Sequence, residues 1–390
     1  MGNNIMKAFG LSLIMGLGLG LSLGVARAAA VPDSSNGWGY GYDSLLSDLG
    51  EWRKNPLVRV DSVGASVKGR AIWMITVTGP EDSLGRPGEP GTRKHRVFIH
   101  ARTHPAEVQA NYVAREAIRF LLDSGAQSAD LRKEFIFNFV PMYNPDGVEE
   151  GHSRQNSHLV DLESNWDQQV LEPEVTVLKR TFEAYMAGPT PIDVALNLHS
   201  DQYSCSRFFV FHLAVGTSPA YEVLEKQFIG QVQSHFPDGI KNFDYQQTWG
   251  TGTAARYPEG FWWLQHREKV MALTYEDANC LNATRFDSTA KALMLGSADY
   301  IRARIVAAVR RIFAGETRML LVPEGVRLTG MPSGSRWELA DIRGRRLAQG
   351  SLWGESILPW SAFPAAPARI LSVFAPGGDV ERIRLPNPSN

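Results

Sequence analysis

The sequence from Arg96 to Leu121, RVFIHARTHPAEVQANYVAREAIRFL, indicates the fold class of this chain. Its first five residues form a short, largely apolar run typical of a buried strand. Ala117, Ile118 and Leu121 follow at the spacing of a helix that faces a core. Pro105 suits a first helical turn, because the N–H that proline lacks would have no partner there. The pattern predicts a strand that leads into a helix beginning at Pro105.

The same alternation of strand and helix continues along the chain. Further strands are predicted at 58–62, 71–77, 135–141, 193–198 and 270–274, and helices at 42–54, 172–187, 219–235 and 297–314. This order predicts an α/β domain over residues 35–314, with a mixed, mostly parallel central sheet flanked by helices. Sites in such sheets form at the carboxyl ends of the strands. Four polar residues fall at those ends: His104, Asn144, His199 and Glu276.

From about Met319 the sequence changes to short apolar segments separated by Gly and Pro. This predicts a small all-β domain over residues 319–390. The segment Trp337–Arg346 resembles the β-sandwich modules appended to exported bacterial enzymes. A sorting signal, a stabilising module and a carbohydrate-binding module are all compatible with it.

The N-terminus carries Lys7, an apolar run from Leu11 to Val25 and then Ala26-Arg27-Ala28. A transmembrane helix needs about 20 apolar residues, and this run is shorter and rich in glycine. We therefore expect residues 1–28 to be a signal peptide and the mature protein to be secreted or periplasmic. We expect no stable membrane insertion once the signal peptide is removed. The alternative is that this segment is a membrane anchor.

The charge of the 390-residue chain is nearly balanced, with 40 Lys and Arg against 41 Asp and Glu. This balance gives no electrostatic argument for binding to nucleic acid or to an anionic membrane surface, and we expect no nucleic-acid partner. The two cysteines, Cys205 and Cys280, form either one disulfide in an oxidising compartment or two buried thiols. The sequence does not define an oligomeric state, so a monomer is the default expectation.

His104-Pro-Ala-Glu107 places an imidazole and a carboxylate three residues apart, so that both can reach one ion from a helical face. By itself the pattern is weak and is equally typical of an ordinary helix start. His199, which ends another buried strand, completes a set of two His and one Glu that recurs in hydrolytic zinc sites.

Glu276 lies at the end of the apolar strand predicted at 270–274. A carboxylate in that position can act as general base on water activated by zinc. Asp277 is the competing residue, and a capping or surface carboxylate is the ordinary structural alternative.

Together these segments resemble the zinc metallocarboxypeptidase family, with its carboxypeptidase A-like fold, over about residues 40–314. The motifs occur in the family's order: Val63–Arg70, His104-x-x-Glu107, Tyr143-Asn-Pro-Asp-Gly147, Asp161-Leu-x-x-Asn-Trp166, His199-Ser and Thr274-Tyr-Glu276. Several ordered motifs are far more specific than any one of them.

The resemblance implies a zinc-dependent hydrolase acting on peptide substrates. One Zn²⁺ per chain would be held by His104, Glu107 and His199, and the attacking water would be activated by the metal and Glu276. Arg154 lies where the family has an arginine that polarises the carbonyl and stabilises the oxyanion. A surface arginine is the alternative.

One departure concerns the substrate-pocket motif that contains Asn165. Members that trim C-terminal residues have Asn-Arg there, and the arginine grips the terminal carboxylate. This chain has Glu163-Ser164. Arg256 is a candidate substitute for that arginine, and Tyr257 is a candidate for the tyrosine that caps the substrate. Trp249, Trp262 and Trp263 either line the cleft or pack in the core.

The departure keeps other functions open. A zinc-dependent amidase or deacylase, or a hydrolase of cell-wall peptides, would retain the metal and change the substrate. A peptide-binding relative without turnover belongs to another class, but the complete ligand set together with Glu276 argues against it.

Overall fold

The structure is a computed structural model that describes residues 39–80, 94–201, 205–280, 282–314 and, with gaps, 318–385. The predicted signal peptide at 1–28 lies outside the described residues. Among the helices within the described ranges, none is both long and apolar enough to cross a membrane.

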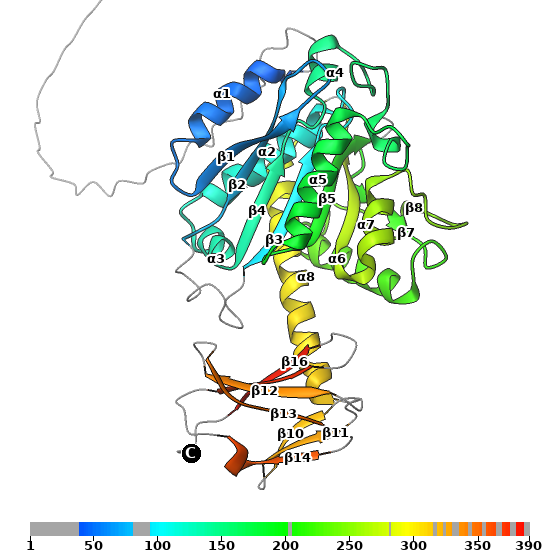
Figure 1. Ribbon diagram of the computed structural model, residues 1–390. Helices are drawn as coiled ribbons and strands as arrows, with labels where there is room; N and C mark the ends of the chain where they lie inside the picture. The colour runs from blue at the N-terminus through cyan, green and yellow to red at the C-terminus, as the bar shows by residue number, and fades with distance from the viewer. Residues whose placement is uncertain are drawn as a thin grey trace, which may run out of the picture.

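A seven-stranded mixed sheet forms the centre of the larger domain (Figure 1). Its order is β1 (Val58–Ala65), β2 (Ala71–Val77), β4 (Phe135–Val140), β3 (His95–Ala101), β5 (Ile192–Asp201), β9 (Met271–Ala278) and β6 (Phe208–Phe209). The four strands from β4 to β9 pair in parallel, and the outer strands pair antiparallel. The predicted mixed α/β fold is confirmed.

Helices cover both faces of this sheet because its strands are apolar on both sides. On β3, Val97 and Ile99 join one core cluster and Phe98 joins the other. The first cluster includes residues of α1 (Tyr42–Trp52), α2 (Val108–Leu122), α3 (Ala126–Glu134), α6 (Pro219–Ser234) and α8 (Phe286–Ala314). The second includes residues of α5 (Pro173–Ala187) and α7 (Pro258–His266).

Two helix boundaries differ from the sequence predictions. The helix expected from Pro105 begins at Val108, because residues 104–107 form a turn closed by a hydrogen bond from Glu107 N to His104 O of 3.1 Å. The last helix of the domain begins at Phe286 rather than at Ser297. The short helix α4 (Pro145–Glu150) was not predicted, although Asn144 caps it by accepting a hydrogen bond from Gly147 N.

The C-terminal region contains two antiparallel sheets. One is formed by β10 (Arg318–Val322), β11 (Gly325–Thr329) and β14 (Ser356–Pro359), and the other by β12 (Arg336–Asp341), β13 (Arg346–Ser351), β15 (Arg369–Phe374) and β16 (Val380–Leu385). Their buried residues form a core cluster of their own, which includes Leu328, Trp337 and Leu371. The all-β character is confirmed, while the boundaries 35–314 and 319–390 stay a prediction.

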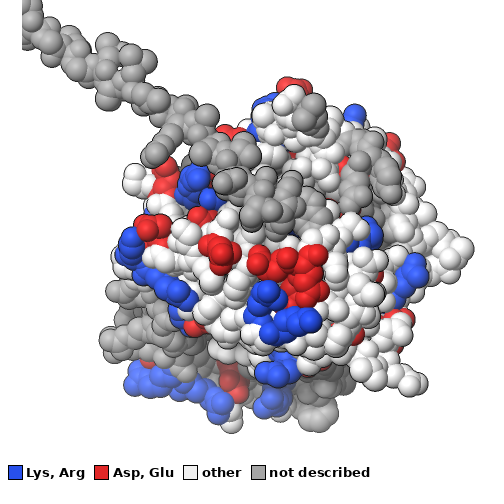
Figure 2. Space-filling view, turned by 90° about the horizontal axis from the view of Figure 1, so that it is seen from above, with Lys and Arg blue, Asp and Glu red and all other residues white. Residues whose placement is uncertain are grey.

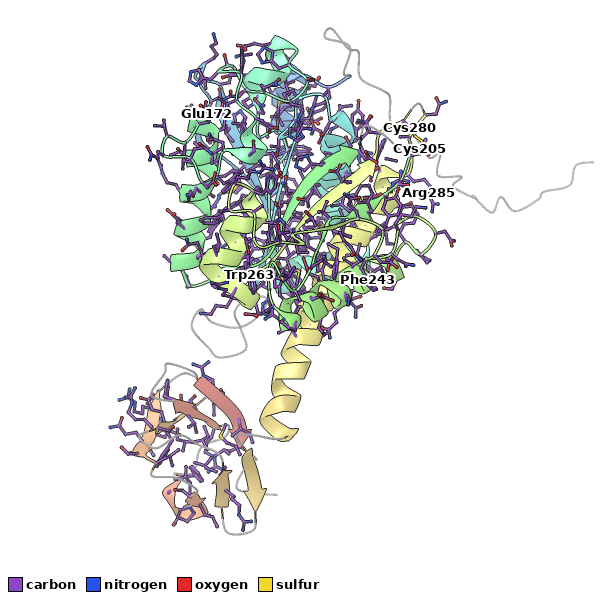
Figure 3. The ribbon with its side chains drawn as sticks, turned by 90° about the vertical axis from the view of Figure 1, so that its right-hand side faces the viewer. Glu172, Cys205, Phe243, Trp263, Cys280 and Arg285 are labelled. Carbon is purple, nitrogen blue, oxygen red and sulfur yellow. A yellow bond between two sulfur atoms is a disulfide. The ribbon has the colours of Figure 1, made fainter. Side chains whose placement is uncertain are left out.

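Two further features bear on the sequence predictions. Cys205 and Cys280 form a disulfide with a Cα–Cα distance of 5.4 Å, and they lie side by side in Figure 3. Acidic and basic side chains are interspersed on the face shown in Figure 2, in keeping with the balanced net charge.

Candidate metal centre and active-site pocket

The turn that carries His104 and Glu107 follows the carboxyl end of β3. Arg102 holds this turn from inside the domain: it is fully buried, and its Nε donates to Pro105 O at 2.6 Å. Its Nη1 donates to Asn111 Oδ1 of α2 at 3.1 Å. The turn is thereby fixed both to itself and to the helix that follows.

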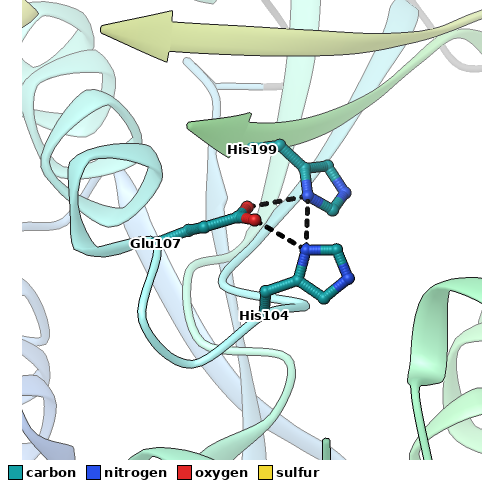
Figure 4. A group of neighbouring side chains, drawn as sticks. All are labelled: His104, Glu107 and His199. Carbon is teal, nitrogen blue, oxygen red and sulfur yellow. Dashed lines mark hydrogen bonds and ion pairs between the residues drawn. The ribbon is translucent and has the colours of Figure 1, made fainter. Parts of the chain in front are cut away.

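Three side chains meet at the carboxyl ends of β3 and β5, and we call them the metal centre: His104, Glu107 and His199 (Figure 4). One ligand atom from each lies within 4.8 Å of the others. Glu107 Oε1 lies 2.7 Å from His104 Nδ1, and Glu107 Oε2 lies 2.8 Å from His199 Nδ1. The two Nδ1 atoms are 3.1 Å apart. Two imidazole nitrogens and a carboxylate facing one point can hold a metal ion.

A second carboxylate binds the far nitrogen of each histidine. Asp161 Oδ1 lies 3.2 Å from His104 Nε2, and Glu163 Oε2 lies 3.2 Å from His199 Nε2. With a metal ion bound, these contacts would keep the imidazole hydrogens on Nε2 and leave the Nδ1 lone pairs for the ion. Carboxylates that orient metal-binding histidines in this way are a recurrent feature of metal sites.

The electrostatics of the metal centre favour a cation. Burial alone would favour the neutral imidazole, but the negative charges of Glu107 and Glu163 hold the pKa of His199 well above its ordinary value. Burial likewise opposes ionisation of Asp161, yet its contacts with His104 lower the pKa of that carboxyl to about 2. A bound divalent cation would take over the stabilising role that protons have in the metal-free site.

Glu276 lies on β9, directly across from His199 on β5. Its Oε2 is buried and has no hydrogen-bond partner among the described residues, and its side chain lines the cavity beside the metal centre. Burial raises the pKa of Glu276 to about 8 in the metal-free protein. Asp277 is engaged elsewhere, accepting hydrogen bonds from Arg207 Nε at 3.0 Å and Tyr275 Oη at 3.1 Å. Of the two competing carboxylates, the structure places Glu276 in the cavity.

The cavity has a volume of about 270 Å³. Its lining comprises His104, Glu107, Arg154, Glu163, His199, Val210, His212, Thr248, Trp249, Tyr257, Glu259, Thr274 and Glu276. Apart from the histidines, Arg154 is the one basic side chain among the described residues that line the cavity. Its Nη2 pairs with Asp161 Oδ2 at 3.2 Å.

The predicted substrate-binding residues fall in different places. Tyr257 lines the cavity, whereas Arg256 is exposed outside the lining and donates from Nη2 to Tyr257 Oη at 2.8 Å. Asn165 is buried away from the cavity, and its Oδ1 accepts a hydrogen bond from Glu172 N at 2.8 Å. Trp249 lines the cavity, while Trp262 and Trp263 belong to the two core clusters.

Three lining or supporting residues were not identified from the sequence: Glu259, His212 and Glu225. His212 Nδ1 lies 2.6 Å from Glu225 Oε1, and both side chains are buried. A signal for Glu225 was present, because it shares the buried face of α6 with Tyr221, Phe228 and Val232. A carboxylate on an apolar helix face requires a partner.

Comparison with known proteins supports the family resemblance. The model of the zinc carboxypeptidase family, peptidase M14, matches residues 46–291, which is more than half of the chain. Cytosolic carboxypeptidase 6 of Caenorhabditis elegans is 31% identical over 160 residues, covering 40% of this chain and 34% of that protein. Cytosolic carboxypeptidase 6 of Mus musculus is 33% identical over 106 residues, covering 27% and 19%. The matched regions thus span about a third or less of these relatives.

Solved structures show the same fold. A metallo-carboxypeptidase from Burkholderia cenocepacia has a TM-score of 0.56 at 21% identity, covering 68% of this chain and 70% of that one. The metallo-carboxypeptidase from Pseudomonas aeruginosa in complex with (2-guanidinoethylmercapto)succinic acid has a TM-score of 0.56 at 19% identity, covering 68% and 69%.

The prediction of a secreted or periplasmic protein is contradicted by the curated relatives, which are cytosolic carboxypeptidases. An apolar N-terminal run does not by itself determine where a chain is delivered, and these comparisons give the predicted signal peptide no support. The predicted family is confirmed. With a family match over residues 46–291 and a His-Glu-His cluster that could hold a metal ion, the chain belongs to the zinc carboxypeptidase family.

Proposed function

We propose that this chain is a zinc-dependent peptidase of the metallocarboxypeptidase type, with Glu276 as its general base. One observation carries the proposal: Glu276, whose buried Oε2 has no hydrogen-bond partner among the described residues, lines the same cavity as three convergent metal-ligand side chains. General bases require this combination of burial and proximity to the reacting water.

The donor set fits zinc, which prefers imidazole nitrogen and carboxylate oxygen in catalytic sites. His104 and His199 would bind through Nδ1 and Glu107 through its carboxylate, with Asp161 and Glu163 fixing the histidines. Zinc, when bound, lowers the pKa of water and polarises the substrate carbonyl.

The residues of the chain divide the remaining work. Glu276 accepts a proton from the water that attacks the peptide carbonyl and passes it to the nitrogen of the leaving amine, so that the C–N bond breaks and a carboxylic acid and an amine result. Arg154 at the cavity places a positive charge where the oxyanion develops, and this is worth about 10²- to 10³-fold in rate at comparable sites. Tyr257 closes over the bound substrate from the cavity wall.

Glu163 favours a second candidate within the same chemistry. A carboxylate where the family has Asn-Arg repels a free C-terminal carboxylate. An amide hydrolase whose substrate lacks that carboxylate at this point is therefore the alternative to removal of an ordinary C-terminal residue.

The test compares the wild type with Glu276→Gln after loading with zinc. Both should bind one zinc per chain by elemental analysis, and the variant should lose about 10²- to 10⁴-fold in kcat. Peptides with free and amidated C-termini, followed by mass spectrometry, separate the two candidates. A zinc-loaded wild type that cleaves none of a broad peptide library would refute the proposal and favour a binding protein.

A further inference from the structure

Two neighbouring carboxylates line the cavity: Glu259, which is buried, and Glu163, whose side chain is 13% exposed and contacts His199. Glu163 and Glu259 both accept hydrogen bonds from Asn197 Nδ2, at 3.1 Å and 3.3 Å. Glu259 Oε1 also accepts from Thr274 Oγ1 at 2.8 Å. The two carboxylates thus share one amide group, and Asn197 and Thr274, which donate to Glu259, are both neutral.

His212 lines the same part of the cavity and is 2% exposed. Glu225 accepts hydrogen bonds from the backbone N–H of His212 at 3.3 Å and from its Nδ1 at 2.6 Å. The imidazole ring packs against Trp249 at a tilt of 35°, with centroids 3.8 Å apart. With the ring hydrogen on Nδ1, the Nε2 atom presents a lone pair, and no described residue donates a hydrogen bond to it. Burial lowers the pKa of His212 to about 4, which keeps this imidazole neutral.

We call Glu163, Glu259 and His212 the acceptor wall, because each presents hydrogen-bond acceptors to the cavity. Two neighbouring carboxylates are unfavourable without a cation. Burial and the charge of Glu163 accordingly raise the pKa of Glu259. Arg154 is paired with Asp161, and His199 contacts Glu163, so that neither of them is paired with Glu259.

We infer that the acceptor wall binds the positively charged group of a basic substrate residue, an ammonium or a guanidinium. Such a group brings several N–H donors together with a positive charge, which satisfies both carboxylates and the Nε2 lone pair. The cavity volume of about 270 Å³ suits one long side chain. The inference rests on the proposed function, because it names the substrate class of the same site.

The experiment measures kcat/KM of the zinc-loaded wild type on peptide pairs that differ only in charge: lysine against norleucine, and arginine against citrulline. The basic residue is placed on either side of the scissile bond in turn. We expect a preference of about 100-fold for the charged peptide at one of these positions, since a site built around polar groups rejects analogues that leave those groups unpaired. Equal rates within each pair at every position would overturn the inference.

Glu259→Gln retains an acceptor for Thr274 but removes the charge. It should reduce the preference to below about tenfold, chiefly through a lower kcat/KM on the lysine and arginine peptides. Glu259→Asp should restore part of the preference and serves as the second variant if Glu259→Gln does not unfold cooperatively. Glu183→Gln, an exposed carboxylate on α5, is the matched control and should retain the full preference. A full preference in both Glu259 variants would overturn the assignment.

A binding measurement separates this inference from the proposed function. Calorimetry of the zinc-loaded wild type with N-acetyl-lysine amide and N-acetyl-norleucine amide needs no turnover. Binding of the lysine compound alone supports the acceptor wall even if no peptide is cleaved. Equal binding of both compounds, binding of neither, or a second tightly bound metal ion per chain would overturn the inference.

Discussion

The metal centre and the acceptor wall line one cavity, but their polar groups are satisfied in different ways. At the metal centre, His104 and His199 each have one nitrogen fixed by an outer carboxylate and the other directed at a shared point. At the acceptor wall, Glu163 and Glu259 share the amide of Asn197. The first arrangement is complete once an ion is added. In the second, Glu163 also contacts His199 Nε2 at 3.2 Å, whereas the donors to Glu259 are the neutral Asn197 and Thr274, and a charged ligand would complete it.

The largest effect should come from His104→Ala, which tests whether the metal centre and the acceptor wall bind their ligands independently. This variant loses a metal ligand, so zinc should be lost and hydrolysis should fall by at least about 10³-fold. Binding of N-acetyl-lysine amide should persist, because His104 is not part of the acceptor wall. His158→Ala, at an exposed histidine paired with Glu172, is the control and should retain zinc. Loss of lysine-amide binding together with zinc would show that the two regions are not separable.

A smaller effect on zinc affinity and substrate preference should distinguish Asp161 from Glu163, the carboxylates that contact Nε2 of the two histidines. Asp161→Asn and Glu163→Gln should each weaken zinc binding by about 10- to 100-fold in competition with a chelator, because each carboxylate orients one ligand. Only Glu163→Gln should also reduce the preference for basic residues. Asp167→Asn, on the exposed surface, controls for the loss of one charge. Identical behaviour of the first two variants would remove Glu163 from the acceptor wall.

The smallest effect concerns the stability of the metal-free protein. The pKa of His212 is about 4 in the folded chain and about 6.5 when unfolded. Between these values the unfolded state binds the proton, so the stability contributed by neutral His212 is present above pH 6.5 and is lost as the pH falls. From pH 7 to pH 5.5 the wild type should lose about 1.4 kcal/mol more than His212→Gln in urea unfolding with a chelator present. Parallel losses in the two proteins would contradict the assigned neutral imidazole.

The clustering of His104, His199 and Glu276 could be predicted from the sequence because each of them follows or ends a strand in the parallel part of the sheet. His199 and Glu276 end neighbouring strands, and the parallel pairing of β5 and β9 places them opposite each other. The local geometry was less predictable. Pro105 indicated a helix start, but the turn pinned by Arg102 delays the helix to Val108. A buried arginine that donates to a backbone carbonyl leaves no trace in hydrophobic periodicity.

The acceptor wall could not be predicted, because its members become neighbours only in the folded chain. Glu259 follows Pro258 at a helix start, where an acidic residue is ordinary. His212 belongs to β7 (Phe211–His212), a strand too short to show a period. Asn165 shows the opposite error: its position within a motif suggested substrate binding, yet its amide oxygen holds the backbone of Glu172.

The disulfide between Cys205 and Cys280 joins the segments that follow β5 and β9, the strands that carry His199 and Glu276. The two cysteines are 75 residues apart in sequence. Cross-linking a chain over that distance lowers the conformational entropy of the unfolded state and stabilises the folded state by about 4 kcal/mol. Reducing conditions would open the bond, so the stability of the segments that follow His199 and Glu276 depends on the thiol redox poise of the compartment in which the protein works.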